Sequence, residues 1–385
     1  MTTILYYLPC FFIGGTELQA VQLVSGLDSR HFRAVVWSSG PPGPVAHILR
    51  RAGVSALYSP LHEATLQQTA AWILDLGATI FHSFGYLPNC LDVVCARLAN
   101  IPWIITSRRN GRHWDRSQRL QLWEKVRNRW TDLVIANCQA VASVCSQVEG
   151  IDPDRLRVVY NGVALPEENG AAGQIRRRLG LGKADLLLGN VANLRPIKNQ
   201  ALLLKAFRLV ARRLSNVHLA ILGEGPERSN LEDLRQKLGL QDRVSFMGLR
   251  ADAHQIYGAM DLYVQSSASE GLPNSVLEAM SHGVPVVATA VGGTPEAVVS
   301  GATGLVVRPG SPQALAEAML RVLTDQRVRR EMGARGRQRV VECFLLSRMV
   351  RDYENIYAAL AQRPESGPSA RRPQIPRPPV AAARV

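Results

Sequence analysis

The stretch that decides the fold runs Glu270-Gly271-Leu272-Pro273-Asn274-Ser275-Val276-Leu277-Glu278. A glycine predicts a turn at its start, and Pro273 suits the first turn of a helix that ends near Gly283. The apolar run 284–288 that follows indicates a buried strand. A carboxylate therefore stands on either side of a helix start, between a turn and a buried strand.

The chemistry of this stretch favours a ligand that carries both phosphate and hydroxyl groups. The first amides of the helix have no partners within it, and the helix dipole favours an anion in front of them. The carboxylates of Glu270 and Glu278 suit hydroxyl groups, and a glycine lets a ligand approach the backbone. We therefore predict a nucleotide-sugar site with the donor-binding residues Gly271, Leu272, Pro273, Asn274, Ser275 and Glu278.

The composition of the chain is that of a globular protein. Its 385 residues are enough for two domains with separate cores, and 46% of them are apolar. No run reaches the roughly 18 apolar residues that a membrane-spanning helix needs. The apolar segment 4–13 lacks the basic start and the cleavage site of a signal peptide. We expect a cytoplasmic protein, or one bound peripherally to the cytosolic face of a membrane.

The net charge of +14 indicates anionic partners such as phosphate, a phospholipid surface or nucleic acid. The six cysteines form no Cys-x-x-Cys pair, so we expect buried free thiols. The sequence Asp152-Pro153-Asp154 looks like a metal-binding pair of carboxylates, but it leads directly into an apolar strand and has no further acidic neighbour. We interpret it as a turn and expect no metal site.

Short apolar strands alternate with amphipathic helices along the whole chain, which predicts parallel sheets covered by helices on both faces. The strands are expected at 4–8, 33–37, 78–83, 102–106, 133–136, 155–160, 186–191, 217–222, 244–248, 262–264, 284–288 and 305–307. Helices are expected to include 200–214, 254–260, 312–323 and 327–360. The segment 166–173 is the best linker, and the Pro- and Arg-rich tail after Gln362 is expected to be disordered.

Polar residues follow several strands of the first half, where α/β folds place their chemistry. The turn Gly14-Gly15 comes after the first strand, and either a ligand site or a plain tight turn accounts for it. His82 ends another strand, where it is either a general base or a hydrogen-bonded structural residue.

Residues 103–130 are rich in tryptophan and in basic side chains. They hold four of the six tryptophans, and eight basic residues face only two acidic ones. This pattern suggests a face for anionic lipid or a lipid-phosphate acceptor. A helix with one packed side and one solvated basic side explains it equally well.

Several motifs together resemble a known family, the retaining glycosyltransferases of the GT-B fold with an E-x7-E motif (glycosyltransferase group 1, family 4-like). Arg195 and Lys198 precede the motif as Arg-x-x-Lys. Glu-Ala-Met-x-x-Gly-x-Pro-Val-Val-Ala follows at 278–288, and Gly-Gly-Thr-Pro-Glu at 292–296. The resemblance extends from the first strand to about Leu360.

The resemblance implies an α/β chain in which two Rossmann-like domains face each other across a cleft. The acceptor-side domain is expected at 1–165, a linker at 166–184 and the nucleotide-sugar-binding domain at 185–345. A C-terminal helix at 346–362 is expected to cross back to the first domain, ahead of the disordered tail 363–385.

The resemblance also assigns roles to residues. Arg195 and Lys198 would neutralise the departing diphosphate, and Glu270 would hold the hydroxyls of the sugar; these three are the expected catalytic residues. Glu278 would hold the ribose, and Gly15 would close on the diphosphate. The acceptor-side candidates are Thr16, Glu17, His82 and Arg109. No metal and no cofactor are expected.

The sequence departs from the family pattern at one place. Many members carry a histidine that contacts the donor sugar after the strand that ends here at Thr106, and this chain has Arg108 there. The paired histidines of the earlier strand end are reduced to His82, with Phe84 at the second place. We therefore assign Arg108 to the donor.

The function expected from the resemblance is transfer of a sugar from a nucleoside diphosphate to a glycan or a lipid-linked acceptor, in polysaccharide or glycolipid synthesis. Residues 103–130 would contact an anionic membrane surface, and nucleic acid is not an expected partner. Two alternatives remain open from the sequence: an epimerase or phosphorylase of the same fold, and a non-enzymatic basic protein that binds polyanions.

Overall fold

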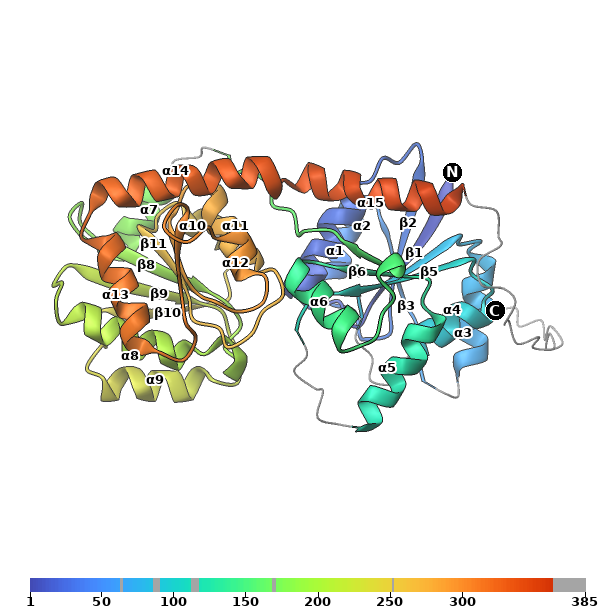
Figure 1. Cartoon of the computed structure of the whole chain (residues 1–385), viewed down its shortest axis with the longest axis horizontal. Coiled ribbons are helices and arrows are strands. Elements are labelled where there is room, and N and C mark those ends of the chain that lie inside the picture. Colours follow the sequence, from blue (N-terminus) through green and yellow to red (C-terminus); the bar gives the residue numbers. More distant parts are fainter. Residues whose placement is uncertain (63–64, 86–90, 112–117, 168–170, 251–252, 363–385) are drawn as a thin grey trace.

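The computed structural model describes residues 1–362 except 63–64, 86–90, 112–117, 168–170 and 251–252. The tail 363–385, which we expect to be disordered, lies outside the described residues. Two lobes, each built on a sheet with helices on its faces, stand side by side (Figure 1). The predicted α/β architecture of two Rossmann-like domains is therefore confirmed.

The first sheet is wholly parallel, and its strand order within the described residues is β3-β2-β1-β4-β5-β6-β7. Its strands are β1 Thr2–Leu8, β2 Phe32–Ser38, β3 Ser55–Tyr58, β4 Ile80–Ser83, β5 Trp103–Arg108, β6 Leu133–Ala136 and β7 Leu156–Val158. The helices of this part are α1 Gly15–Gly26, α2 Pro44–Arg51, α3 Leu66–Asp75, α4 Leu91–Leu98, α5 Gln118–Trp130 and α6 Gln139–Gln147. The order of strands reverses between β1 and β4, which is where such sheets bind ligands.

The second sheet is also parallel, in the order β10-β9-β8-β11-β12-β13 over the described residues. Its strands are β8 Leu186–Val191, β9 Val217–Leu222, β10 Val244–Gly248, β11 Leu262–Gln265, β12 Val286–Thr289 and β13 Gly304–Val307. Its helices are α7 Ala171–Arg178, α8 Gln200–Ala211, α9 Arg228–Lys237, α10 Ala253–Tyr257, α11 Asn274–Ser281, α12 Thr294–Ala297 and α13 Pro312–Leu323. Here the order reverses between β8 and β11.

Two elements differ from the expectations. The segment 166–184, expected as a linker, contains α7, whose Ile175 is buried in the core of the second lobe. The helix expected over 327–360 is two helices, α14 Gln326–Cys343 and α15 Leu346–Ala361. It breaks because the backbone of Val163 hydrogen-bonds Phe344 and Leu346, in place of helix partners.

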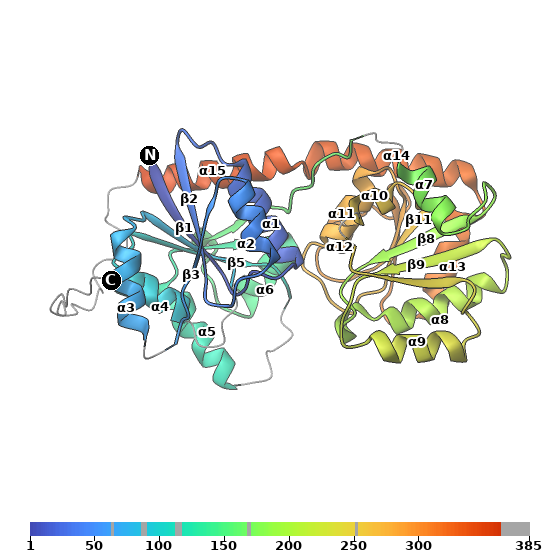
Figure 2. The ribbon, with the colours of Figure 1, turned by 180° about the vertical axis from the view of Figure 1, so that it is seen from behind.

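The helices α14 and α15 run end to end along one side of both lobes (Figures 1 and 2). On the second lobe, α14 comes so close that a side chain at Gly333 would meet the carbonyl of Gly283 at 1.9 Å. On the first lobe, α15 buries Tyr353 and Tyr357 in the core. The C-terminal part of the chain therefore joins the two lobes, because α14 packs on the second lobe and α15 on the first.

The lobes also share a hydrophobic core. Val134, Cys138 and Cys145 of the first lobe lie in one buried cluster with Leu272 and Val276 of the second. Burial of apolar side chains from both lobes against each other stabilises their arrangement. This shared core lies beside the start of α11. It therefore fixes residues 270–278, which we call the donor stretch, relative to the first sheet.

Candidate active site

Glu270 lies in the loop between β11 and α11, and its side chain is buried. Its Oε1 atom accepts hydrogen bonds from Lys198 Nζ at 2.6 Å, Ser267 Oγ at 2.6 Å and Gln265 Nε2 at 3.3 Å. Lys198 ends a short 3-10 turn, Pro196–Lys198, that follows β8. The structure therefore brings together two predicted catalytic residues from loops at the carboxyl ends of neighbouring strands.

The loop that carries Lys198 is tied directly to the end of β11. The amide of Ala268 donates to the carbonyl of Ile197 at 2.8 Å, and Ser266 Oγ donates to the carbonyl of Lys198 at 3.1 Å. Arg195, at the start of the same turn, is exposed. The loop after β8 thus carries two cations, one held by a buried carboxylate and one exposed to solvent.

The helix α11 begins at Asn274, because Pro273 has extended backbone angles and acts as its N-cap. No side chain caps the first turn, so its amides stay available to an anion. Ser275 Oγ accepts a hydrogen bond of 2.7 Å from the buried hydroxyl of Tyr263. The helix start predicted from the sequence is thus present, and Tyr263 holds its first turn from the β11 side.

Two glycine turns meet here. A side chain at Gly271 would lie 1.9 Å from the carbonyl of Arg109 in the other lobe, and one at Gly292 would lie 2.0 Å from the carbonyl of Glu270. Gly292 also has a φ of +51°, which favours glycine. The amide of Gly293 donates to the carbonyl of Gly271 at 2.7 Å. The second turn therefore packs on the first, and glycine is required at both.

Glu278 lies one turn further along α11 and is half-buried. Tyr257 donates a hydrogen bond of 2.6 Å to Glu278 Oε2. Burial raises the pKa of the Glu278 carboxyl, while the Tyr257 hydrogen bond and nearby His254 lower it. Sequence reasoning missed Tyr257, because it comes from α10, and no local pattern links the two elements.

On the first lobe, the turn Gly14-Gly15 lies against the start of α11. Asn274 Nδ2 donates to the carbonyl of Gly15 at 2.9 Å. Glu17, in the first turn of α1, lies near Arg109 and Arg195, whose charges lower the pKa of its carboxyl, although burial raises it more. Thr16 is half-buried in the same turn. The acceptor-side candidates Thr16, Glu17 and Arg109 therefore lie beside the donor stretch.

Arg108 is not beside the donor stretch. Its side chain is 1% exposed, and its guanidinium donates to Glu149 at 3.1 Å and to Asn128 at 2.6 Å within the first lobe. Arg109, the next residue, instead donates to Asn161 Oδ1 at 2.7 Å, at the contact between lobes. Arg108 therefore does not take the place that we expected for it, and the arginine that lies against the second lobe is Arg109.

His82 is fully buried, and both of its ring nitrogens have partners. Nδ1 lies 2.7 Å from the hydroxyl of Tyr357, and Nε2 lies 2.9 Å from Ser107 Oγ. Burial, and secondly the charge of Arg109, lower the pKa of His82 to about 3. Of the two roles left open by the sequence, the geometry fits the hydrogen-bonded structural residue, since an acceptor has no access to the ring.

The basic stretch 103–130 presents less charge to solvent than its sequence suggests. Arg108, Arg109 and Arg127 are buried and hydrogen-bonded inside the first lobe. Lys125 and Arg129 on α5 are exposed. Arg112 and Arg116 lie outside the described residues, as does the side chain of Arg119. No helix among the described residues is long and apolar enough to cross a membrane.

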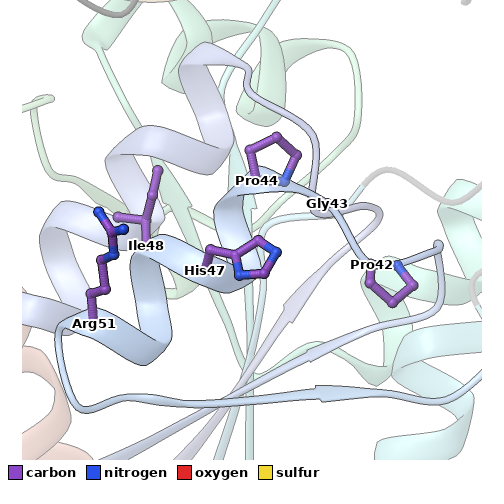
Figure 3. A pocket seen from close by; sticks show the side chains of 6 residues that line it. All are labelled: Pro42, Gly43, Pro44, His47, Ile48 and Arg51. Carbon is purple, nitrogen blue, oxygen red and sulfur yellow. The ribbon is translucent and has the colours of Figure 1, made fainter.

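A hollow of about 440 Å³ lies elsewhere on the first lobe, around the start of α2 (Figure 3). It is lined by Pro42, Gly43, Pro44, His47, Ile48 and Arg51. None of the predicted site residues contributes to it.

Over the described part of the chain, no cluster of three His, Cys, Asp or Glu side chains is placed to hold a metal ion. Asp152 caps the short turn Pro153–Arg155 by accepting from the amide of Asp154.

Two parallel Rossmann-like sheets in two facing lobes are the architecture of the GT-B fold. Residues 172–339 match the family of glycosyl transferases group 1, and residues 13–166 match glycosyltransferase family 4. This chain belongs to the group 1 glycosyltransferases.

Two curated relatives illustrate the similarity. D-inositol 3-phosphate glycosyltransferase of Corynebacterium urealyticum is 30% identical in an alignment of 324 positions that covers 77% of this chain and 75% of the relative. N-acetyl-alpha-D-glucosaminyl L-malate synthase of Bacillus anthracis is 30% identical over 194 residues, 50% of this chain and 51% of the relative. The match to the Bacillus protein thus spans about half its length.

Solved structures share the fold. HepE from Anabaena, in complex with UDP-glucose, aligns with a TM-score of 0.82 and 22% identity over 93% of this chain and 100% of its own. A glycosyltransferase from Rickettsia africae aligns with a TM-score of 0.82 and 17% identity over 94% and 99%. At these identities the likeness shows the fold alone.

Proposed function

We propose that this glycosyltransferase moves a sugar from a nucleoside diphosphate to a glycan or lipid-linked acceptor, with retention of anomeric configuration and without a metal. The observation that carries the proposal is the Lys198–Glu270 pair, 2.6 Å apart, in the loops that follow β8 and β11, together with a first turn of α11 whose N-cap offers no side-chain hydrogen bond. A diphosphate in front of this helix would meet amides and two cations. The sugar attached to it would meet a buried carboxylate.

The proposed chemistry follows from the charge on the leaving group. When the bond between the anomeric carbon and the phosphate oxygen breaks, its electrons go to that oxygen, and negative charge grows there. Arg195 and Lys198, with the amides of α11, stabilise this charge. They do the work that a metal ion does in other transferases. Glu270 holds hydroxyls of the sugar, and Glu278 holds the ribose.

Retention is proposed to occur by attack from the face that the phosphate leaves. The acceptor hydroxyl bonds to the anomeric carbon and gives its proton to the departing phosphate oxygen, so no protein nucleophile is needed. The full burial of His82 supports this view, because the ring is not available as a base. The acceptor would approach from the first lobe, beside Thr16 and Glu17.

The names of similar proteins support a choice of first substrates. Structures of HepE contain UDP, glucose and UDP-glucose, so uridine diphosphate sugars are the first donors to test. A relative 36% identical over 132 residues is named for lipopolysaccharide core biosynthesis in Rhizobium meliloti. Glycan and lipid-linked acceptors are therefore the first acceptors to test.

The experiment is thermal unfolding against a panel of nucleoside diphosphates and their sugars. A ligand that binds only the folded state raises the melting temperature, by an amount that grows with its concentration relative to Kd. We expect the nucleotides of one base to raise the melting temperature more than the others do. Transfer with that donor is then followed by NMR of the anomeric proton, with and without EDTA. Retained configuration and full activity in EDTA are expected.

Each part of the proposal has its own contradicting result. A melting temperature that responds to no nucleotide would overturn the donor site. An inverted product would overturn retention, and loss of activity in EDTA that Mg²⁺ restores would overturn metal independence. Release or epimerisation of the sugar without an acceptor would point to the epimerase or phosphorylase alternative. Polyanion binding that disappears on deletion of 363–385, without nucleotide binding, would favour the non-enzymatic one.

A further inference from the structure

Asn161 lies three residues after the end of β7, at the point where the first lobe meets the donor stretch of the second. Its side chain is 2% exposed, and all of its hydrogen-bonding groups are used. Oδ1 accepts from Arg109 Nη2 at 2.7 Å. Nδ2 donates to the carbonyl of Leu272 at 2.7 Å and to Asn274 Oδ1 at 2.6 Å. One side chain of the first lobe therefore holds the residue before the N-cap and the first residue of α11.

The chain of hydrogen bonds continues back to the first lobe. Because Asn274 Oδ1 accepts from Asn161, its Nδ2 is turned toward Gly15, whose carbonyl it reaches at 2.9 Å. Asn274 is thus held by the first lobe at both ends of its amide. Gly15 belongs to the turn that faces the predicted diphosphate, so the same chain also fixes that turn.

The direction of this chain is fixed by chemistry. An arginine can only donate, so it requires the oxygen of the Asn161 amide. A backbone carbonyl can only accept, so Leu272 requires the nitrogen. The carbonyl of Gly15 sets the Asn274 amide in the same way. The order Arg109 to Asn161 to Asn274 to Gly15 is the single arrangement in which every group has a matching partner.

We propose that Asn161 is a positioning residue that couples contact between the lobes to the shape of the donor site. This inference rests on the proposed function. When the lobes are in contact, Asn161 orients the start of α11 and, through Asn274, the Gly15 turn. Without Asn161 the lobes separate more readily, and a smaller fraction of the protein is competent to bind the diphosphate. Saturating donor, which itself bridges the two lobes, restores the competent state.

The test compares Asn161→Ala with Tyr160→Phe. Tyr160 is the preceding residue and also bridges the lobes, but its hydroxyl donates its hydrogen bond of 3.0 Å to Glu296 and not to α11. We expect Asn161→Ala to raise the Kd of UDP, and the KM of the donor, by about tenfold, as loss of a buried hydrogen bond predicts. We expect kcat to change by less than about threefold, because donor binding drives closure. Tyr160→Phe is expected to match the wild type.

A second variant separates the proposal from loss of packing. Asn161→Asp keeps the size of the side chain and the contact with Arg109, but it places an acceptor against the carbonyl of Leu272 and Asn274 Oδ1. If the fixed order of donors and acceptors is what positions α11, Asn161→Asp should weaken UDP binding at least as much as Asn161→Ala. A purely structural role predicts that the better-fitting aspartate is the milder change, and that result would overturn the proposal.

Small-angle X-ray scattering without nucleotide gives a readout that does not depend on the donor. We expect a larger radius of gyration for Asn161→Ala than for the wild type or Tyr160→Phe, and a return toward the wild-type value in saturating UDP. Equal UDP affinity in Asn161→Ala and the wild type would overturn the positioning role. A wild-type protein that binds no nucleotide at all would instead overturn the proposed function.

Discussion

Lys198 Nζ lies 2.6 Å from Glu270 Oε1, with the lysine side chain 27% exposed and the glutamate side chain 7% exposed. The carboxylate is buried and accepts a further hydrogen bond from Ser267, whereas the lysine side chain keeps contact with solvent. Because only the glutamate is buried, the pair holds the lysine ammonium group in place while leaving it partly exposed. It suits a lysine that must meet phosphate charge as that charge appears.

Lys198→Met tests the cation of this pair. It keeps most of the length of the side chain and removes its charge. We expect kcat to fall on the order of 100-fold, because a preorganised partner of the leaving group is lost. The measurement is steady-state transfer, with the melting temperature recorded because Glu270 loses its partner. Arg335→Met, which breaks an exposed pair with Glu331, is the control and should leave kcat unchanged.

Tyr257→Phe tests the support of Glu278. The Tyr257 hydrogen bond lowers the pKa of a carboxyl that burial raises, so its loss raises the pKa further. In the role that we propose for Glu278, the ionised carboxylate accepts hydrogen bonds from the ribose hydroxyls. UDP affinity should therefore decline as pH falls, with a midpoint at higher pH in Tyr257→Phe than in the wild type. Calorimetric titration with UDP across pH measures this, and Tyr58→Phe on the surface is the control. Coincident midpoints would contradict the role of Tyr257.

His82→Asn tests the buried imidazole through the pH dependence of stability. The pKa of His82 is about 3 in the folded protein, against about 6.5 when unfolded. Between these values the unfolded state binds the proton and the folded state does not, so the imidazole makes the protein less stable as pH falls from 6.5 toward 3. Its contribution is fully present above pH 6.5.

We expect the free energy of unfolding of His82→Asn to depend less on pH over this interval, by up to about 1.4 kcal/mol per pH unit. Denaturant unfolding at several pH values measures the slope for both proteins. Identical slopes would show that His82 is protonated in the folded state. The slope is informative even when the variant is less stable at every pH, because it depends only on proton uptake.

Gly271→Ala tests the close approach of the two lobes at the donor stretch. A methyl group there would lie 1.9 Å from the carbonyl of Arg109, so either the lobes separate or the loop moves. We expect loss of nucleotide-induced stabilisation in thermal unfolding. The control is Gly173→Ala in α7, where the nearest atom is 3.6 Å away. That change should be neutral or stabilise by up to about 1 kcal/mol, since alanine favours helices.

The local structure of residues 270–278 could be predicted from the sequence because its determinants are local. Pro273, the glycines and the spacing of Glu270 and Glu278 act through backbone geometry over a few residues. The strands of the second sheet were placed almost to the residue for the same reason. Their apolar runs are short, buried and bounded by turn residues. The elements β3, α2, α3, α4 and α7 were not predicted.

Arg108 and Arg109 show where sequence reasoning stopped. Successive side chains at the end of a strand point to opposite sides. Arg108 therefore points into the interior of the first lobe, and Arg109 points to the contact between the lobes. The buried carboxylate of Glu149, 41 residues away, takes Arg108. The amide of Asn161, 52 residues away, takes Arg109. Counting residues along one strand therefore cannot show which distant partner each arginine has.

The sequence by itself determined the alternation of strands and helices, the helix start at Pro273 and the glycine turns around it, because steric and hydrogen-bonding preferences of neighbouring residues specify them. The tertiary structure decided which polar residues share the site. Asn161, Asn274 and Gly15 meet only after two separate sheets pack on a common core, and His82 becomes inaccessible only when Tyr357 arrives with α15. Such contacts depend on long-range burial, which local patterns do not encode.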